Sequence, residues 1–306
     1  MTAASLLPDT VRVFERGWLS ANNILMLGDG ETTLIDTGYL THAPQTLALV
    51  EHALQGRPLQ RIVNTHLHSD HCGGNALLQA HFGCRVLVPV SEEAHVRDWD
   101  VDKLSFKATG QQCARFRCDG TVSPGDVLEM GEREWHVLGA SGHDAHSLML
   151  YCARDGILIS ADALWQNGFG VIFPELDGES GFAEERATLD LIATLDARVV
   201  IPGHGAVFTD VDAALKRAGN RLAFLSSNPV RNAEYAVKVL LKFLLLERQR
   251  MAVADIPALF ASMPIVAAAS RRYLDKSPEE LANWTIKQLV RACSARIESD
   301  YLLNDG

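Results

Sequence analysis

Short apolar runs with the alternation of β-strands dominate the first part of the chain. Residues 11–14, 23–27 and 32–36 follow one another closely, and Gly28-Asp29-Gly30 supplies a hairpin turn between the last two. Further strands are predicted at residues 61–64, 85–88, 134–138, 147–152, 156–160 and 198–201. Residues 99–120 show no clear period and are expected to form a long loop.

Apolar positions three and four residues apart predict helices between these strands and after them. The helical patterns cover residues 44–54, 75–81, 91–98, 182–195, 211–225, 233–247, 256–261 and 278–299. Strand signals stop at about residue 210. Because Asn228-Pro229 interrupts the later helices, we place a boundary between an α/β domain at 1–225 and a helical C-terminal extension at 226–306.

The distribution of charge limits the partners of the chain. Its 306 residues carry a formal net charge of -10, and residues 226–306 are nearly neutral, with 11 Lys and Arg against 9 Asp and Glu. Binding to nucleic acid needs clustered Lys and Arg to neutralise phosphates, so a nucleic acid partner is disfavoured. The slightly basic tail leaves an opening for an anionic ligand.

Neither disulfides nor membrane insertion is indicated. The six cysteines are scattered without a Cys-x-x-Cys pair, and the first residues lack the basic and apolar segments of a signal peptide. The most apolar later stretch, residues 236–246, is too short to span a bilayer and is interrupted by Lys238 and Lys242. We therefore expect a cytoplasmic protein with no membrane segment. A homodimer is an open alternative to a monomer.

Four potential metal ligands lie within six residues directly after the strand predicted at 61–64. In an extended chain alternate side chains share a side, so His66 and His68 can point at one ion. If the chain then turns into the helix near Gly73, Asp70 and His71 move to a second position nearby. Imidazole and carboxylate are ligands expected for zinc, iron or manganese. This spacing predicts a metal site.

The histidine cluster resembles the signature of the metallo-β-lactamase-fold hydrolase superfamily, which is His-x-His-x-Asp-His after a strand. Four more of its motifs occur here in the expected order. They are Leu34-Ile35-Asp36-Thr37-Gly38, Ser141-Gly142-His143, Ser160-Ala161-Asp162 and Pro202-Gly203-His204-Gly205. The resemblance covers about residues 10–208, and it makes residues 1–225 a metallo-β-lactamase-like catalytic domain.

The resemblance implies an αββα sandwich, an α/β fold with a dinuclear metal site at one edge of its two sheets. Zinc is the favoured ion, with iron and manganese as alternatives. The family pattern gives His66, His68 and His143 to the first metal, Asp70, His71 and His204 to the second, and Asp162 to both. It also puts Asp36 behind the ligands, as an acceptor for the second ring N–H of a ligating histidine. His146 is expected to support the site in a similar way or to contact substrate.

The implied chemistry is hydrolysis of a small molecule. Metal binding lowers the pKa of a shared water toward about 7, which provides a metal-bridging hydroxide as nucleophile. Asp70 and Asp162 are the predicted catalytic carboxylates, and Asp70 orients or deprotonates the water. The Gly73-Gly74 pair and the helical extension are similar to those of glyoxalase II and related thioesterases and lactonases.

We therefore expect a thioester or a lactone as substrate. A phosphodiesterase or ribonuclease of the same fold is an alternative, and a metal-bound sensor with little turnover is another.

Overall fold

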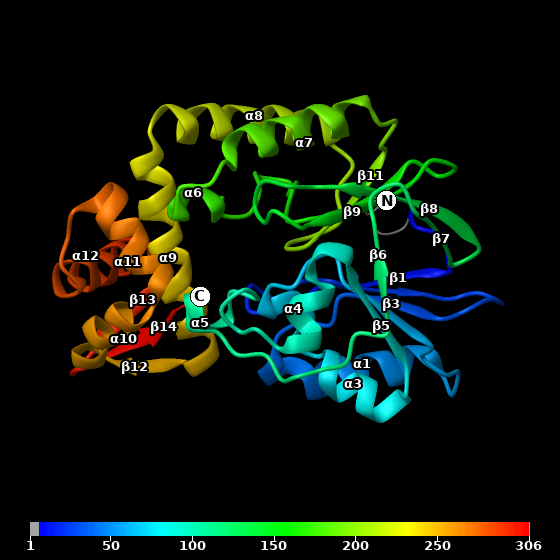
Figure 1. The fold of residues 1–306 in the computed structure, drawn as a ribbon, viewed down its shortest axis with the longest axis horizontal. Coiled ribbons are helices and arrows are strands. Elements are labelled where there is room, and N and C mark those ends of the chain that lie inside the picture. The colour runs from blue at the N-terminus through cyan, green and yellow to red at the C-terminus, as the bar shows by residue number, and fades with distance from the viewer. Residues whose placement is uncertain (1–5, 306) are drawn as a thin grey trace.

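Two β-sheets face each other in the computed structural model, which describes residues 6–305 (Figure 1). The first sheet has the order β1-β2-β3-β4-β5-β6. Its strands are β1 (Val11–Phe14), β2 (Asn23–Met26), β3 (Thr33–Ile35), β4 (Arg61–Val63), β5 (Arg85–Pro89) and β6 (Gly120–Val122). β1, β2 and β3 form an antiparallel meander, whereas β3 to β6 pair in parallel. The carboxyl ends of β3 and β4 therefore meet at one edge of the sheet.

The second sheet has the order β11-β10-β9-β8-β7. Its strands are β7 (Val127–Met130), β8 (Arg133–Gly139), β9 (Leu148–Cys152), β10 (Ile157–Ala161) and β11 (Val199–Pro202). All neighbours are antiparallel except β10 and β11, which are parallel. Apolar side chains from both sheets share one core cluster, which includes Ile35, Val63, Trp135 and Ile159. This cluster holds the two sheets face to face.

Helices cover the outer face of each sheet. α1 (Ala43–Leu54) and α3 (Asn75–Phe82) pack on the first sheet, and α7 (Phe182–Thr194) and α8 (Val211–Ser227) pack on the second (Figure 1). The predicted αββα sandwich is thus confirmed. The shorter helices are η2 (Leu40–His42), α2 (Ser69–Cys72), η3 (Val90–Glu92), α4 (Glu93–Asp98), α5 (Phe106–Thr109) and α6 (Pro174–Asp177).

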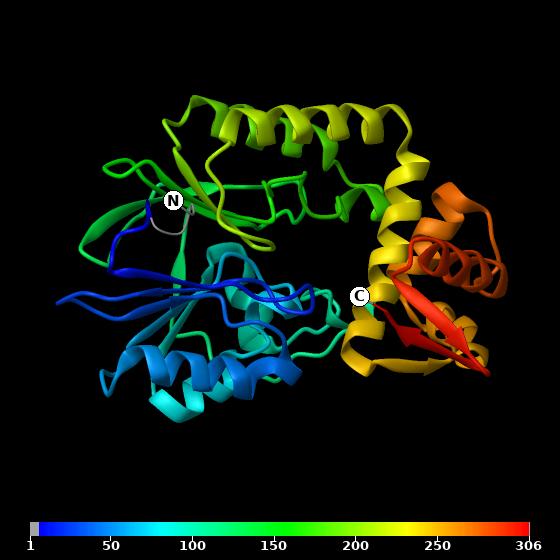
Figure 2. The same cartoon turned by 180° about the vertical axis from the view of Figure 1, so that it is seen from behind.

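The C-terminal region begins with α9 (Pro229–Arg248), which runs along one edge of the sandwich from the end of α8 (Figure 2). The remaining elements are β12 (Arg250–Ala252), η4 (Val253–Asp255), α10 (Ile256–Ser262), α11 (Pro264–Ala269), η5 (Ser270–Leu274), α12 (Pro278–Arg291), β13 (Ala295–Glu298) and β14 (Tyr301–Asn304). The three strands form an antiparallel sheet of order β12-β14-β13. A helical C-terminal region is present as expected, but it also contains strands.

Two expectations about secondary structure are wrong, and several short elements, among them β7, were not predicted. The helix predicted at 278–299 ends at Arg291, and the left-handed backbone of Cys293, with φ of 53°, turns the chain into β13. The loop predicted at 99–120 contains α5 and reaches β6, which is only three residues long. The sequence does not predict β7, because only Met130 among its four side chains is buried and the strand lacks a regular apolar alternation.

The chain turns at Asn228, between α8 and α9. The domain boundary between residues 225 and 226 stays a prediction. Within residues 6–305 no single helix is long and apolar enough to cross a membrane, and one bent pair, Val253–Ser262 with Pro264–Leu274, meets the length and composition criteria only together.

Candidate metal centre

All seven predicted ligands come together at one edge of the sandwich, and each follows a strand or ends one. β4 leads into the segment with His66, His68, Asp70 and His71, the last two of which lie on α2. The other three follow β8, β10 and β11, and they are His143, Asp162 and His204. Loops at strand ends present their side chains on a rigid framework.

His66, His68 and His143 form one compact group. The Nδ1 atom of His68 lies 3.1 Å from Nε2 of His66 and 2.8 Å from Nε2 of His143. The three donor atoms all lie within 4.8 Å of one another, which is close enough for one ion to contact each of them. His66 and His143 are buried, whereas His68 is partly exposed.

Asp70, His71 and His204 form a second group beside the first. The Nε2 atom of His204 lies 3.1 Å from Oδ2 of Asp70. Asp162 lies between the two groups, because its Oδ2 atom is 3.4 Å from Nε2 of His143, 3.5 Å from Nε2 of His71 and 3.9 Å from Nε2 of His204. One carboxylate thus reaches both sets of imidazoles.

The protonation states of these groups suit divalent cations. Burial and the neighbouring histidines lower the pKa of His66 well below its usual value, and burial together with His68 lowers the pKa of His143 to about 4. Burial opposes ionisation of Asp162, but the charges of His71 and His204 hold its pKa well below the usual range. Nε2 of His71 is buried, and it faces the Oδ2 atom of Asp162 at 3.5 Å. Neutral His66 and His143 beside the ionised carboxylate of Asp162 provide nitrogen and oxygen lone pairs of the kind that a divalent metal ion requires.

Residues 16–204 match the family described as the Metallo-beta-lactamase superfamily. The chain belongs to this superfamily. Among curated relatives it is similar to a hydroxyacylglutathione hydrolase of Rhizobium etli, with 25% identity over 186 residues that cover 60% of this chain and 61% of that protein. It is also similar to a hydroxyacylglutathione hydrolase of Rhodopseudomonas palustris, with 32% identity over 149 residues that cover 44% of this chain and 51% of that protein. The chain thus spans between one half and three fifths of the length of these relatives.

Solved structures support the same fold. A metallo-beta-lactamase family protein from Thermus thermophilus superimposes with a TM-score of 0.59 at 21% identity, and the match covers 98% of this chain and 100% of that one. The BLEG-1 B3 metallo-beta-lactamase superimposes with a TM-score of 0.56 at 21% identity, over 67% of this chain and 96% of that one. The resemblance to the superfamily that the sequence motifs suggested is confirmed.

Asp36 lies behind His71 in this superfamily site. Its Oδ2 atom accepts a hydrogen bond of 2.7 Å from Nδ1 of His71, and its two oxygens also accept from the backbone N–H and the hydroxyl of Thr65, at 2.9 and 2.7 Å. The bond from Nδ1–H fixes the orientation of the His71 ring, so that its Nε2 atom faces the side of the site where Asp162 lies. Burial opposes protonation of His71, but Asp36 and Asp162 raise its pKa well above the usual value when no cation is bound.

Sequence reasoning missed several supporting groups. The backbone carbonyl of Val171 accepts a hydrogen bond of 2.6 Å from Nδ1 of His143. The indole of Trp165 donates to Oδ1 of Asp162 at 3.2 Å. A Cβ atom at Gly203 would clash with the same Oδ1, so this glycine lets β11 approach Asp162 closely. The glycine in Pro202-Gly203-His204 could have been identified from the sequence as a position of close approach. The carbonyl group of Val171 could not, because every residue has one.

Among the described residues, His146 makes no hydrogen bond or ion pair with the predicted ligands. Its Nε2 atom lies 3.6 Å from Oε1 of Glu92, and its backbone N–H donates to Asp144. Asp144 instead approaches the site itself, because its Oδ2 atom lies 3.5 Å from Nε2 of His68. The role of His146 in supporting the site or contacting substrate stays a prediction, and Asp144, which the sequence analysis did not name, faces His68 from the same turn.

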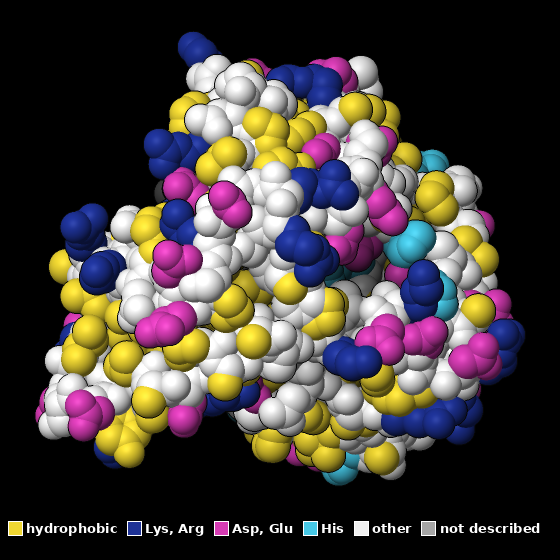
Figure 3. All heavy atoms as spheres, turned by 60° about the vertical axis from the view of Figure 1, so that its left-hand side comes forward, with side chains coloured by type: hydrophobic (Ala, Val, Ile, Leu, Met, Phe, Trp, Pro, Cys, Tyr) yellow, Lys and Arg dark blue, Asp and Glu magenta, His cyan; other side chains and the backbone are white. Residues whose placement is uncertain are grey.

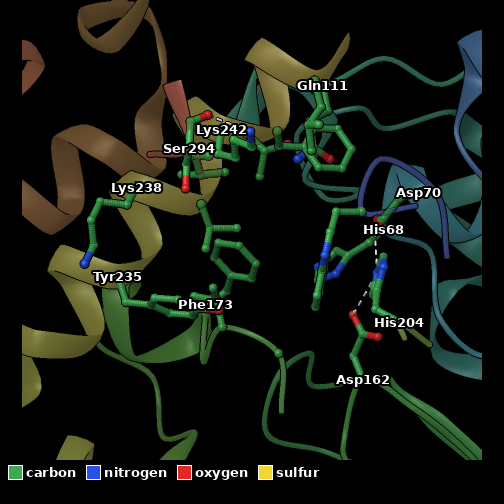
Figure 4. Close-up of a pocket in the computed structure, with 18 of the residues that line it drawn as sticks. His68, Asp70, Gln111, Asp162, Phe173, His204, Tyr235, Lys238, Lys242 and Ser294 are labelled. Carbon is green, nitrogen blue, oxygen red and sulfur yellow. Dashed lines mark hydrogen bonds and ion pairs between the residues drawn. The ribbon is translucent and has the colours of Figure 1, made fainter. Parts of the chain in front are cut away.

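A cavity of about 540 Å³ opens beside the ligands, which lies within the size range of small-molecule sites. His68, Asp70, Asp162 and His204 line one side of it, and α9 lines the other (Figure 4). The space-filling view shows a hollow on this face with acidic and histidine side chains inside it and Lys or Arg beside it (Figure 3). Trp18 stands at the rim with 59% of its surface exposed and stacks on the ring of His204, with centroids 5.4 Å apart.

Proposed function

We propose that this chain is a hydrolase of a small ester-type substrate, a thioester or a lactone, with two divalent ions at its centre. The observation that carries the proposal is the position of Asp162 between two sets of imidazoles at the floor of an open cavity. One ion would be held by His66, His68 and His143, the other by Asp70, His71 and His204, and Asp162 would contact both. Zinc is the first candidate for both positions, and iron and manganese accept the same nitrogen and oxygen ligands.

When bound, such ions lower the pKa of a coordinated water and polarise a carbonyl oxygen. The side chains of this chain then position the substrate and the protons. Asp70 lines the cavity, and although burial opposes it, the charges of His204 and His71 lower the pKa of its carboxyl group. An ionised carboxylate there can orient the attacking water and accept its proton.

The overall reaction balances without a further reagent. The water oxygen forms a bond to the acyl carbon, and the bond from that carbon to sulfur or to the ring oxygen breaks. The proton taken up by Asp70 is delivered to the departing thiolate or alkoxide, which leaves a carboxylic acid and a thiol or alcohol. The relatives named hydroxyacylglutathione hydrolases favour the thioester, since their name describes the hydrolysis of an acyl group carried on glutathione.

Metal content and a substrate panel test the proposal together. The wild-type protein should bind two ions per chain, and the metal-loaded protein should hydrolyse a thioester or a lactone faster than a phosphodiester. Asp162→Asn should lower both the metal content and the rate, the latter by about a hundredfold or more. Asp212→Asn, which changes an exposed carboxylate on α8, is the matched control and should alter neither.

Three outcomes would contradict the proposal. Fewer than two ions under all loading conditions would exclude a dinuclear centre. Preferential cleavage of a phosphodiester would favour the nuclease alternative. Turnover of none of the panel by the fully loaded wild type would remove the hydrolase assignment.

A further inference from the structure

One stripe of α9 faces the cavity. Its residues recur at intervals of three and four, which puts them on one side of a helix. They are Tyr235, Lys238, Val239, Lys242, Phe243 and Leu246. With a rise of about 1.5 Å per residue the stripe is roughly 16 Å long, so the cavity offers a trough along the helix rather than a small pit.

The wall of this trough is mainly apolar. Val239, Phe243 and Leu246 contribute aliphatic and aromatic surface from α9, and Phe173 lies on the side of the metal centre (Figure 4). The ring of Phe173 is 5.5 Å from that of His68 and 5.6 Å from that of His143. An apolar group that starts at the metal centre can therefore continue past Phe173 and against the apolar side chains of α9, and the charges on this wall are those of Lys238, Lys242 and Asp305.

The two lysines of the stripe differ in their partners. Nζ of Lys242 donates to the backbone carbonyls of Ser294 and Asp305, at 2.7 and 3.1 Å, and to the side chain of Asn304 at 2.6 Å. The ammonium group of Lys242 is therefore hydrogen-bonded to the C-terminal segment. Lys238 makes no hydrogen bond or ion pair with the residues between 6 and 305, and its half-buried side chain lines the cavity. An ammonium group in such a place pairs well with a ligand anion.

We propose that the substrate of this site is an acyl compound with an extended apolar arm, which lies along α9 past Phe173 and ends in a carboxylate or phosphate that pairs with Lys238. This inference rests on the proposed hydrolase function and specifies the substrate class. The proposed substrate differs from the glutathione thioester that the name of the relatives describes. The glutathione tripeptide carries several charges and amides, and an apolar trough with one available cation would leave most of them unpaired at a cost in binding.

A series of synthetic thioesters that share one thiol tests the apolar arm. We expect kcat/KM to rise by about threefold to fourfold for each added methylene until the trough is filled. Val239→Trp narrows the trough and should reduce kcat/KM more for long acyl chains than for short ones. Equal values across the chain-length series would exclude the apolar arm.

The anionic end is tested with pairs of acyl chains of equal length that end in a carboxylate or in a methyl ester. The wild type should prefer the carboxylate by about tenfold or more, and Lys238→Met should abolish most of this preference. Lys238→Arg should restore part of it. Lys216→Met removes an exposed lysine of α8 and should leave the preference unchanged. A preference that survives in Lys238→Met would overturn the role of Lys238.

Binding provides a readout that is independent of turnover. Dicarboxylates of about four to twelve carbons, titrated into the metal-loaded protein by calorimetry, should bind more tightly than the matching monocarboxylates at one optimal length. This advantage should be lost in Lys238→Met. If short thioesters are hydrolysed but neither chain length nor terminal charge matters, the inference fails while the proposed function stands. If no thioester or lactone is hydrolysed, the proposed function itself fails.

Discussion

At the scale of single residues, the centre depends on close approaches that only glycine allows. A Cβ atom at Gly170 would clash with Nδ1 of His143, the atom that donates to the carbonyl of Val171. Gly170→Ala should therefore displace the His143 ring and weaken metal binding by about tenfold to a hundredfold. Competition with a chelator measures this affinity.

Gly30→Ala is the control for that substitution, because a Cβ atom there meets nothing within 4 Å. It should leave metal binding unchanged. An unchanged metal affinity in Gly170→Ala would show that the position of His143 does not depend on this contact.

Glu185 supports the loop of His143 as a buried carboxyl group. It is fully buried on α7, its carboxyl group lies against the backbone of Gly142 and His143, and a Cβ atom at Gly142 would clash with one of its oxygens. Burial raises the pKa of Glu185 well above its usual value, and Asp162 adds to this effect while Arg221 opposes it. The folded protein therefore holds this proton more tightly than the unfolded chain does.

The sign of the resulting pH dependence follows from that difference. An acid with a raised pKa in the folded state contributes stability that is present below its usual pKa of 4.5 and is lost as pH rises through the folded pKa. Glu185→Gln cannot ionise, so its unfolding free energy should increase relative to wild type as pH rises above 4.5. Urea unfolding of the metal-free proteins measures this change, with the exposed Asp190→Asn as control. A difference that is constant with pH would show that Glu185 ionises normally.

Residues also differ in how far the sequence predicts their position. His66, His68, Asp70 and His71 were predictable as neighbours because the chain between them is too short to separate them. The approach of His204 to Asp70, at 3.1 Å across the two sheets, followed only from the family motifs. The acceptor role of the Val171 carbonyl was not predictable, since every residue has a carbonyl group and the fold alone selects this one.

At the scale of elements, Lys242 connects α9 to the end of the chain. It donates to the carbonyl of Ser294, just before β13, and to Asn304 at the end of β14. Lys242→Met should remove these charge-assisted bonds and destabilise the small sheet by roughly 1.5–3 kcal/mol. Hydrogen exchange should then become faster in β13 and β14 than elsewhere. Lys287→Met on α12 removes an exposed lysine and is the control. Equal exchange in both variants would show that Lys242 does not hold the sheet.

The same small sheet shows why some elements escape prediction. Ile297 of β13 is 52% exposed, so the strand has no buried alternation to distinguish it from the end of a helix. Its pairing extends through β14 to β12, more than forty residues earlier in the chain. The apolar pattern at 278–299 predicted a helix to the end of this range. The chain forms β13 there instead because of pairing with β14, which a local pattern does not show. By contrast, α1, α7 and α8 carry long amphipathic patterns and were predicted to within a few residues.

At the scale of the whole molecule, the C-terminal region shares a core with the loop that follows β10 of the sandwich. Val171 and Leu176, from the loop after β10, belong to the same apolar cluster as the buried face of α9. The amide of Asn232 on α9 donates to the carbonyl of Ile172 at 2.8 Å. The loop that carries the acceptor for His143 is thus held from the C-terminal side.

This arrangement predicts that the residues before α9 do not make a complete site by themselves. A chain that ends at residue 227 would expose the apolar face that α9 covers, and it should aggregate or bind metal more weakly than the full chain.

Asn232→Leu provides the milder test, because it removes the hydrogen bond to Ile172 while keeping α9. It should weaken metal binding by about tenfold, since an unsupported loop no longer fixes the Val171 carbonyl. Circular dichroism checks that the variant keeps its helices. Full metal affinity in both the shortened chain and Asn232→Leu would mean that the metal centre is independent of α9, and that α9 serves only the substrate.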